Sequence, residues 1–279
     1  MPLLSDVGPT MTSTPSKSLG SLAVTLVEPS AMQGKIILAQ LEAAGLRDIH
    51  QAASGTEALA GMKLTPPDLV VSALYLPDMT GTDLVAAMRQ SPALEQTAFI
   101  LVSSETRPQA LEPVRQSGVC AILPKPFSPE QLRHALANTR ELLKHDTDLS
   151  GQLEAEHLRV LLVDDSLSAR RFMRRVLENL GITHFIEAEN GRQAVAILAE
   201  TMVDLVVTDY NMPEMDGEAL VHHIREKGWQ QSVPILMVTS ESSAGRLAAV
   251  QQAGVSGICD KPFEPAVVKS LLWSMLNGG

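Results

Sequence analysis

The chain has 279 residues, of which 45% are hydrophobic and 3% aromatic, and its formal net charge is -10. This length predicts two domains, because a typical domain has roughly 100–200 residues. The excess of acidic residues argues against binding to nucleic acid or to anionic membranes, which needs an excess of Lys and Arg. Two cysteines without a CxxC pair suggest neither a disulfide scaffold nor a zinc site. No apolar run reaches the roughly 18 residues of a membrane span, and no signal peptide is visible, so we expect a cytoplasmic protein.

An internal repeat organises the sequence. Residues 1–19 are rich in Ser, Thr and Pro and predict a flexible tail. Beyond them, a shift of 136 positions aligns the two halves without a gap, placing Val24–Glu28 on Val160–Asp164 and Lys125–Phe127 on Lys261–Phe263. This period exceeds the roughly 20–50 residues of solenoid repeats, so it indicates a duplicated domain. We place the copies at residues 20–137 and 157–279, joined by residues 138–156 as either a helical extension or a polar linker.

The second copy alternates apolar runs suited to buried strands with segments of helical periodicity. The predicted strands cover residues 159–163, 184–188, 205–208, 234–238 and 257–259. The predicted helices cover residues 169–180, 192–200, 218–226, 244–253 and 265–276. Strand–helix units in succession predict a parallel five-stranded sheet with helices on both faces. Each copy is therefore expected to adopt an α/β, doubly wound, flavodoxin-like (βα)5 fold.

Chemically active side chains follow the predicted strands of the second copy. Ligands of open α/β sheets bind beyond the carboxyl ends of the strands, so these residues should meet in one crevice: Asp164, Asp165, Asp209, Thr239 and Lys261. A single Asp after a strand is usually a helix N-cap or a turn residue. The combination is far more specific, because every member stands at the carboxyl end of a predicted strand and the members come in a fixed order.

Three clustered carboxylates repel one another, and a hard divalent cation such as Mg²⁺ relieves the repulsion. Lys261 could then neutralise a phosphoryl group, and the Thr239 hydroxyl could donate to it. A carboxylate can itself be the nucleophile. The set therefore predicts in-line phosphoryl transfer onto an Asp side chain, assisted by Mg²⁺.

The second copy resembles a response-regulator receiver domain of two-component signalling, close to the single-domain chemotaxis receiver. The matching stretches are VLLVDDS, VVTDYNMPEMDG, ILMVTSE and ICDKPF. The resemblance implies that a histidine kinase or histidine phosphotransfer protein phosphorylates Asp209. It further implies that Asp165, Asp209 and the backbone carbonyl of Asn211 bind Mg²⁺, that Asp164 acts through metal-bound water, and that Thr239 and Lys261 bind the phosphoryl group. One departure is Ile258, which stands where the family often has a switch Tyr or Phe.

The first copy lacks decisive residues of this set. Glu28, Pro29 and Ala73 align with Asp164, Asp165 and Asp209, whereas Ser103 and Lys125 keep the phosphoryl-binding positions. Without a carboxylate at position 73, no aspartyl phosphate can form there. We interpret this copy as a degenerate receiver with a protein-binding or dimerising role, the alternative being a structural remnant that only supports its neighbour.

We therefore expect a phosphorelay response regulator with tandem receivers and no separate output domain, acting through a phosphorylation-controlled contact with a downstream protein or through changed dimerisation. It is expected to accept and self-hydrolyse phosphate rather than to be a dedicated enzyme. The alternatives are a phosphate sink or relay intermediate, and a phosphatase of the haloacid-dehalogenase type, which expects two Asp separated by one residue. Four arginines of one predicted helix, at positions 170, 171, 174 and 175, form either a solvated face or a docking patch for an acidic phosphodonor.

Overall fold

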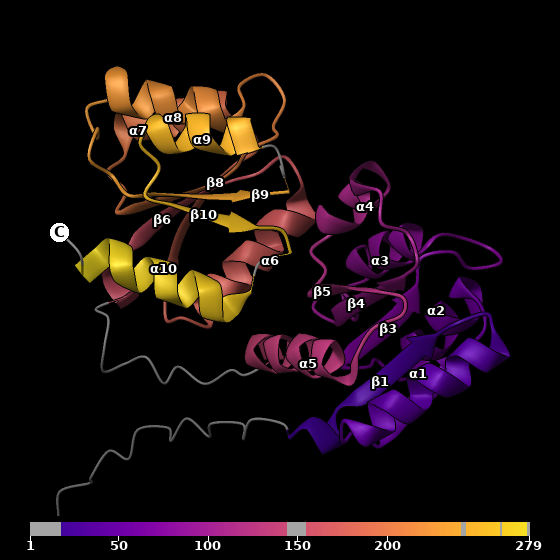
Figure 1. Ribbon diagram of the computed structural model, residues 1–279. Helices are drawn as coiled ribbons and strands as arrows, with labels where there is room; N and C mark the ends of the chain where they lie inside the picture. The colour runs from indigo at the N-terminus through magenta and orange to yellow at the C-terminus, as the bar shows by residue number, and fades with distance from the viewer. Residues whose placement is uncertain (1–17, 144–154, 241–243, 263, 278–279) are drawn as a thin grey trace, which may run out of the picture.

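The computed structural model describes residues 18–143, 155–240, 244–262 and 264–277. These residues form two α/β units that lie next to each other (Figure 1). Most of the predicted tail, residues 1–19, and most of the predicted linker, residues 138–156, lie outside the described ranges. The last helix of the first unit continues to Leu143, beyond the predicted domain end at 137.

The first unit is a five-stranded parallel sheet of order β2-β1-β3-β4-β5. A short 3-10 helix, Leu19–Ser21, precedes it. Its strands are β1 (Ala23–Val27), β2 (Asp48–Ala52), β3 (Leu69–Ala73), β4 (Ala98–Ser103) and β5 (Ala121–Pro124). Its helices are α1 (Ala31–Ala43), α2 (Gly55–Leu64), α3 (Gly81–Arg89), α4 (Pro108–Arg115) and α5 (Pro129–Leu143).

The second unit repeats this topology after a 3-10 turn, Ala155–His157, with the sheet order β10-β9-β8-β6-β7. Its strands are β6 (Arg159–Val163), β7 (His184–Ala188), β8 (Leu205–Asp209), β9 (Ile235–Thr239) and β10 (Gly257–Asp260), all paired in parallel. Its helices are α6 (Leu167–Glu178), α7 (Gly191–Glu200), α8 (Gly217–Glu226), α9 (Ala244–Gln252) and α10 (Pro265–Asn277). The predicted five-stranded, doubly wound fold is confirmed in both copies.

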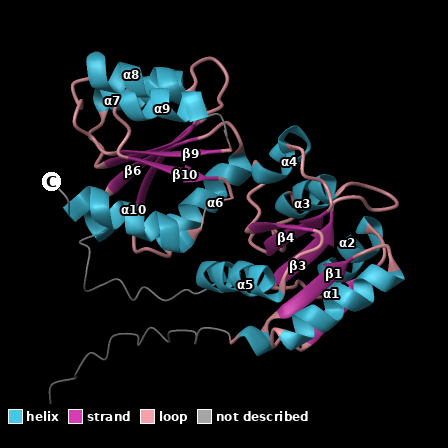
Figure 2. Cartoon of the chain, viewed as in Figure 1, coloured by secondary structure: helices cyan, strands magenta, loops and turns pink. Residues whose placement is uncertain are grey.

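Helices cover both faces of each sheet (Figure 2), which explains why the central strands are mostly apolar. All residues of β8 and β9 are buried, as expected for strands enclosed on both sides. Short polar side chains start the helices: Ser166 Oγ accepts from the backbone N–H of Ala169, and Asp216 Oδ1 accepts from that of Ala219. Gly181 follows α6 with a φ of 88°, a conformation that favours glycine.

One apolar core cluster extends through both units. It includes Leu41 of α1 and Leu136 of α5 in the first unit, and Val176 of α6 and Leu272 of α10 in the second. The opposite face of each sheet has a cluster of its own. The two units therefore share buried apolar contacts along the α5, α6 and α10 side, where the views place α5 near α10 (Figure 1).

Candidate functional site at the carboxyl ends of the second sheet

The parallel sheet of the second unit brings the predicted polar residues to one edge. Asp164 follows β6, Asp209 is the last residue of β8, and Thr239 is the last residue of β9. Lys261 follows β10, whose Asp260 pairs with Thr239. Because these four strands are neighbours in the order β10-β9-β8-β6, side chains far apart in sequence meet at their ends.

Lys261 is the centre of a buried ion-pair group. Its Nζ lies 2.7 Å from Asp164 Oδ2 and 3.1 Å from Asp209 Oδ1. Both aspartates and Thr239 are fully buried, whereas Asp165 and Asn211 are exposed at the rim. One carboxylate oxygen from each of Asp164, Asp165 and Asp209 falls within 4.8 Å of the others. The structure thus brings the predicted acidic residues and the lysine together.

Burial dominates the electrostatics of the carboxyl groups. Desolvation raises the pKa of Asp209 to about 6, although the nearby Lys261 ammonium opposes this shift. Desolvation also raises the pKa of Asp164 against the same opposing charge. Burial would lower the pKa of Lys261, but the two carboxylates outweigh it and raise that pKa. The site therefore holds more negative charge than one ammonium compensates, which is the condition that favours a bound cation.

A residue of the first unit completes the site. The Gln116 side chain, from the turn between α4 and β5, accepts a hydrogen bond from Lys261 Nζ at 2.8 Å through Oε1. Its Nε2 donates to Asp209 Oδ2 at 3.3 Å. Sequence reasoning missed Gln116, because a lone glutamine after a helix has no pattern that links it to a carboxylate in the other copy.

One protein-family model matches two separate segments of the chain. The model of the response regulator receiver domain matches residues 24–137 and again residues 160–272. The chain belongs to the response regulator receiver family. It is therefore a two-component response regulator with tandem receiver domains, which the four matching stretches of the second copy had indicated.

Single-domain chemotaxis proteins are among the similar proteins. A chemotaxis protein CheY homolog of Campylobacter jejuni is 37% identical over 123 residues, which are 44% of this chain and 95% of that protein. Chemotaxis protein CheY-3 of Vibrio cholerae is 37% identical over 117 residues, covering 42% and 90% respectively. The solved structure of chemotaxis response regulator CheY4 of Vibrio cholerae is 32% identical, with a TM-score of 0.39, and covers 42% of this chain and 98% of that chain.

The first receiver has a different arrangement at the equivalent strand ends. Lys125 Nζ forms an ion pair with Glu28 Oε2 at 2.6 Å, and Ala73 ends β3 where the second receiver has its buried aspartate. Pro29 offers no side-chain ligand. Among the described residues, the acidic cluster of the second receiver is the only group of three or more potential metal-ligating side chains. The first receiver thus keeps a lysine–carboxylate pair but has no aspartate at the end of β3.

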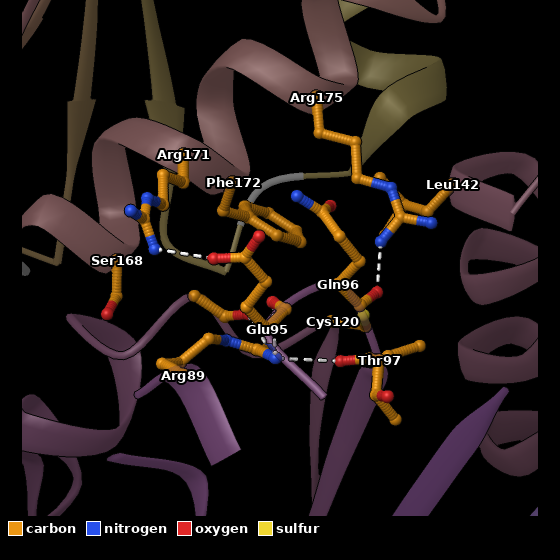
Figure 3. A pocket seen from close by; sticks show the side chains of 12 residues that line it. Arg89, Glu95, Gln96, Thr97, Cys120, Leu142, Ser168, Arg171, Phe172 and Arg175 are labelled. Atoms are coloured by element: carbon orange, nitrogen blue, oxygen red, sulfur yellow. Dashed lines mark hydrogen bonds and ion pairs between the residues drawn. The ribbon is translucent and has the colours of Figure 1, made fainter. Parts of the chain in front are cut away.

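The arginine-bearing face of α6 is only partly the solvated surface that one interpretation expected, because Arg171 and Arg174 are exposed whereas Arg170 is buried. Arg170 is 5% exposed, and its guanidinium donates to the Asp164 carbonyl at 2.6 Å and pairs with Glu187 at 3.3 Å. Arg171 and Arg175 contact the first receiver instead (Figure 3). Arg170 pairs with carboxylates of its own receiver, and the first receiver covers only part of the remaining face, through Glu95 and Gln96. No helix among the described residues is long and apolar enough to cross a membrane.

Proposed function

We propose that the second receiver accepts a phosphoryl group on Asp209 from the phosphohistidine of a histidine kinase or a histidine phosphotransfer protein. The observation that carries the proposal is the fully buried Asp209 carboxylate, 3.1 Å from the Lys261 ammonium and grouped with two further aspartates. Burial in a pocket of fixed charges strengthens electrostatic stabilisation of a transferred phosphoryl group. The chemotaxis relatives and the family match support the same assignment.

In the proposed reaction, a carboxylate oxygen of Asp209 attacks phosphorus in line with the phosphorus–nitrogen bond of phosphohistidine. A phosphorus–oxygen bond forms, the phosphorus–nitrogen bond breaks, and the imidazole nitrogen keeps the electron pair and takes a proton from solvent. Lys261 neutralises charge on the phosphoryl oxygens, and the Thr239 hydroxyl at the end of β9 donates to one of them. Arg170 has a positioning role, because it holds the Asp164 backbone carbonyl at 2.6 Å.

The donor set of the site suits Mg²⁺, which prefers oxygen ligands and usually retains several waters. Carboxylate oxygens from three aspartates lie within 4.8 Å of one another, and Asp165 stays exposed to solvent. We propose that Asp165, Asp209 and the Asn211 carbonyl hold the ion, with Asp164 acting through a bound water. When bound, Mg²⁺ would offset the carboxylate repulsion and bind phosphoryl oxygens.

The first receiver is proposed to act by protein contact, since Ala73 has no nucleophilic group. The chain is then a phosphate-accepting signalling protein that also loses phosphate by hydrolysis, and not a dedicated enzyme. Its output is a phosphorylation-controlled contact with a downstream protein. A role as a phosphate sink predicts instead that the phosphorylated chain binds only kinases and phosphotransfer proteins.

A Phos-tag gel with acetyl phosphate and Mg²⁺ tests the acceptor. Wild type is expected to give a shifted band, and Asp209→Ala is expected to give none. Asp260→Ala is a matched control, because Asp260 is an exposed carboxylate at the end of β10, the edge strand of the same sheet. A shifted band that survives in Asp209→Ala would overturn the assignment and would also show a second acceptor in the chain.

A further inference from the structure

Gln116 of the first receiver occupies the space beside the acceptor that a phosphoryl group needs. Its amide group lies between Lys261 Nζ, 2.8 Å from Oε1, and Asp209 Oδ2, 3.3 Å from Nε2. Lys261 thus directs a hydrogen bond to Gln116 while it also contacts Asp209. A phosphoryl group on Asp209 would compete with the amide of Gln116 for this donor and for the space beside Oδ2.

Hydrogen bonds around Gln116 hold the turn in place. Ser166 Oγ, at the start of α6, donates to the Gln116 backbone carbonyl at 2.7 Å. Ser240 Oγ, just after β9, donates to Glu112 Oε1 of α4 at 2.5 Å. Glu112 Oε1 in turn accepts from Gln116 Nε2 at 3.1 Å. The end of α4 is therefore hydrogen-bonded to the start of α6 and to the residue that follows β9.

A second group of contacts extends this interface along α6 (Figure 3). Arg171 Nη1 pairs with Glu95 Oε2 at 2.9 Å, and Arg175 donates to the Gln96 carbonyl. Phe172 lies between these arginines in a crevice of about 20 Å³, room for about one water. Combined with the apolar cluster shared by the two receivers, these contacts describe a tightly packed interface.

We propose that the first receiver is an intramolecular cap on the phosphorylation site, with Gln116 as the residue that occupies the phosphoryl position. The capping surface consists of α4, the turn that contains Gln116, and the loop at Glu95 and Gln96. In the capped arrangement Asp209 has no exposed surface. A phosphohistidine must bring its phosphorus into bonding distance of Asp209, so the cap has to leave first.

Release of the first receiver from the phosphorylation site would give this degenerate receiver a role in the output contact. This inference rests on the proposed function, because it concerns the same acceptor. Phosphorylation and capping exclude each other, so by linkage the phosphoryl group must lower the docking equilibrium constant by the same factor by which docking disfavours the phosphorylated form at equilibrium. Phosphorylated chains would therefore expose the arginine face of α6 and the capping surface as new contact sites.

Paired substitutions in the full-length chain test the cap. Gln116→Ala removes both amide contacts and is expected to speed labelling of Asp209 by acetyl phosphate about tenfold, which corresponds to ~1.4 kcal/mol. Gln33→Ala is the matched control, because Gln33 is exposed on α1 of the same receiver. Its labelling rate should equal that of wild type.

A second pair separates opening of the interface from loss of the amide. A Cβ at Gly118 would lie 2.9 Å from the Ser168 carbonyl oxygen and 3.0 Å from Phe172 Cβ, both in the second receiver. Gly118→Ala should therefore force the receivers apart and speed labelling. Gly45→Ala is its control, because Gly45 also has a positive φ, of 103°, but its Cβ would meet nothing within 4 Å.

Small-angle scattering measures the reciprocal effect, with acetyl phosphate and Mg²⁺ as the probe. Labelled wild type should have a larger radius of gyration than unlabelled wild type, and Asp209→Ala should show no change. The cap is overturned if wild type is labelled but Gln116→Ala and Gly118→Ala are both labelled no faster than wild type. That outcome leaves the proposed function intact. Absence of label in every variant overturns both.

Discussion

Gly217 lies directly behind the proposed acceptor, where substitution by alanine should have a large cost. It is the first residue of α8, and its N–H donates to the Tyr210 carbonyl at 2.8 Å. A Cβ at this position would overlap the Asp209 carbonyl oxygen and lie 3.0 Å from Tyr210 Cα. Both neighbours are backbone atoms of the acceptor segment, so no side-chain rotation relieves the overlap. Overpacking of this kind costs about 1–3 kcal/mol.

Replacing a helical glycine with alanine also raises the unfolding free energy by about 0.5–1 kcal/mol, because glycine loses more conformational freedom on folding. The net expectation for Gly217→Ala is therefore a loss of about 1–2 kcal/mol in the unfolding free energy of the second receiver. Both tryptophans, Trp229 and Trp273, belong to that receiver, so their fluorescence during urea unfolding reports on it specifically. With a slope of about 1–3 kcal/mol/M, the midpoint should fall by roughly 0.5–1 M.

Gly245→Ala is the control for this experiment. It removes the same unfolded-state freedom in the same receiver, yet its Cβ would meet nothing within 4 Å. The midpoint of this variant should equal or exceed that of wild type. If Gly217→Ala proved as stable as Gly245→Ala, the close approach of α8 to the acceptor strand would not be a packing constraint.

Two further predictions concern buried titratable groups. Burial raises the pKa of Asp209 to about 6, above the roughly 3.9 of an unfolded chain. The unfolding free energy therefore falls as pH rises from about 4 to 6, because the buried carboxyl group resists ionisation. Metal-free Asp209→Asn should therefore be more stable than wild type at pH 7.5, by about 3 kcal/mol in urea unfolding, with a gap that closes toward pH 4; a gap independent of pH would contradict this. Burial also raises the pKa of Cys120, and that of Cys259 to about 12. Both thiols should react with a thiol reagent at pH 8 only after urea unfolding, and rapid reaction of the folded chain would show that the core around them opens.

The two copies show how one fold is kept while the residues at its strand ends change. Lys125 and Glu28 preserve a lysine–carboxylate contact at 2.6 Å in the first receiver. The same contact in the second receiver is part of a larger group that includes Asp209. Retaining the pair satisfies the charge of a partly buried lysine without an acceptor, which fits a copy that acts by contact.

Much of the second receiver could be predicted from local patterns alone. The predicted strands at 159–163 and 184–188 agree with β6 and β7 residue for residue. For β6 the signal is an apolar run of strand length, which is typical of a strand buried on both faces of a covered sheet. The grouping of Asp164, Asp209 and Lys261 also followed from sequence, since parallel strands bring their carboxyl ends to one edge. The duplication was readable because both copies keep the same spacing.

Tertiary structure alone decided how the two copies meet. Gln116 lies 93 positions before Asp209, and Arg171 lies 76 positions after Glu95. Periodicity and motif spacing describe contacts within one element or one sheet, so they contain no information about which outer surfaces pack together. Sequence therefore determined two receivers and the one carboxylate that we propose as the acceptor. The docking of the first receiver over that carboxylate depends on complementary surfaces that exist only after both domains have folded.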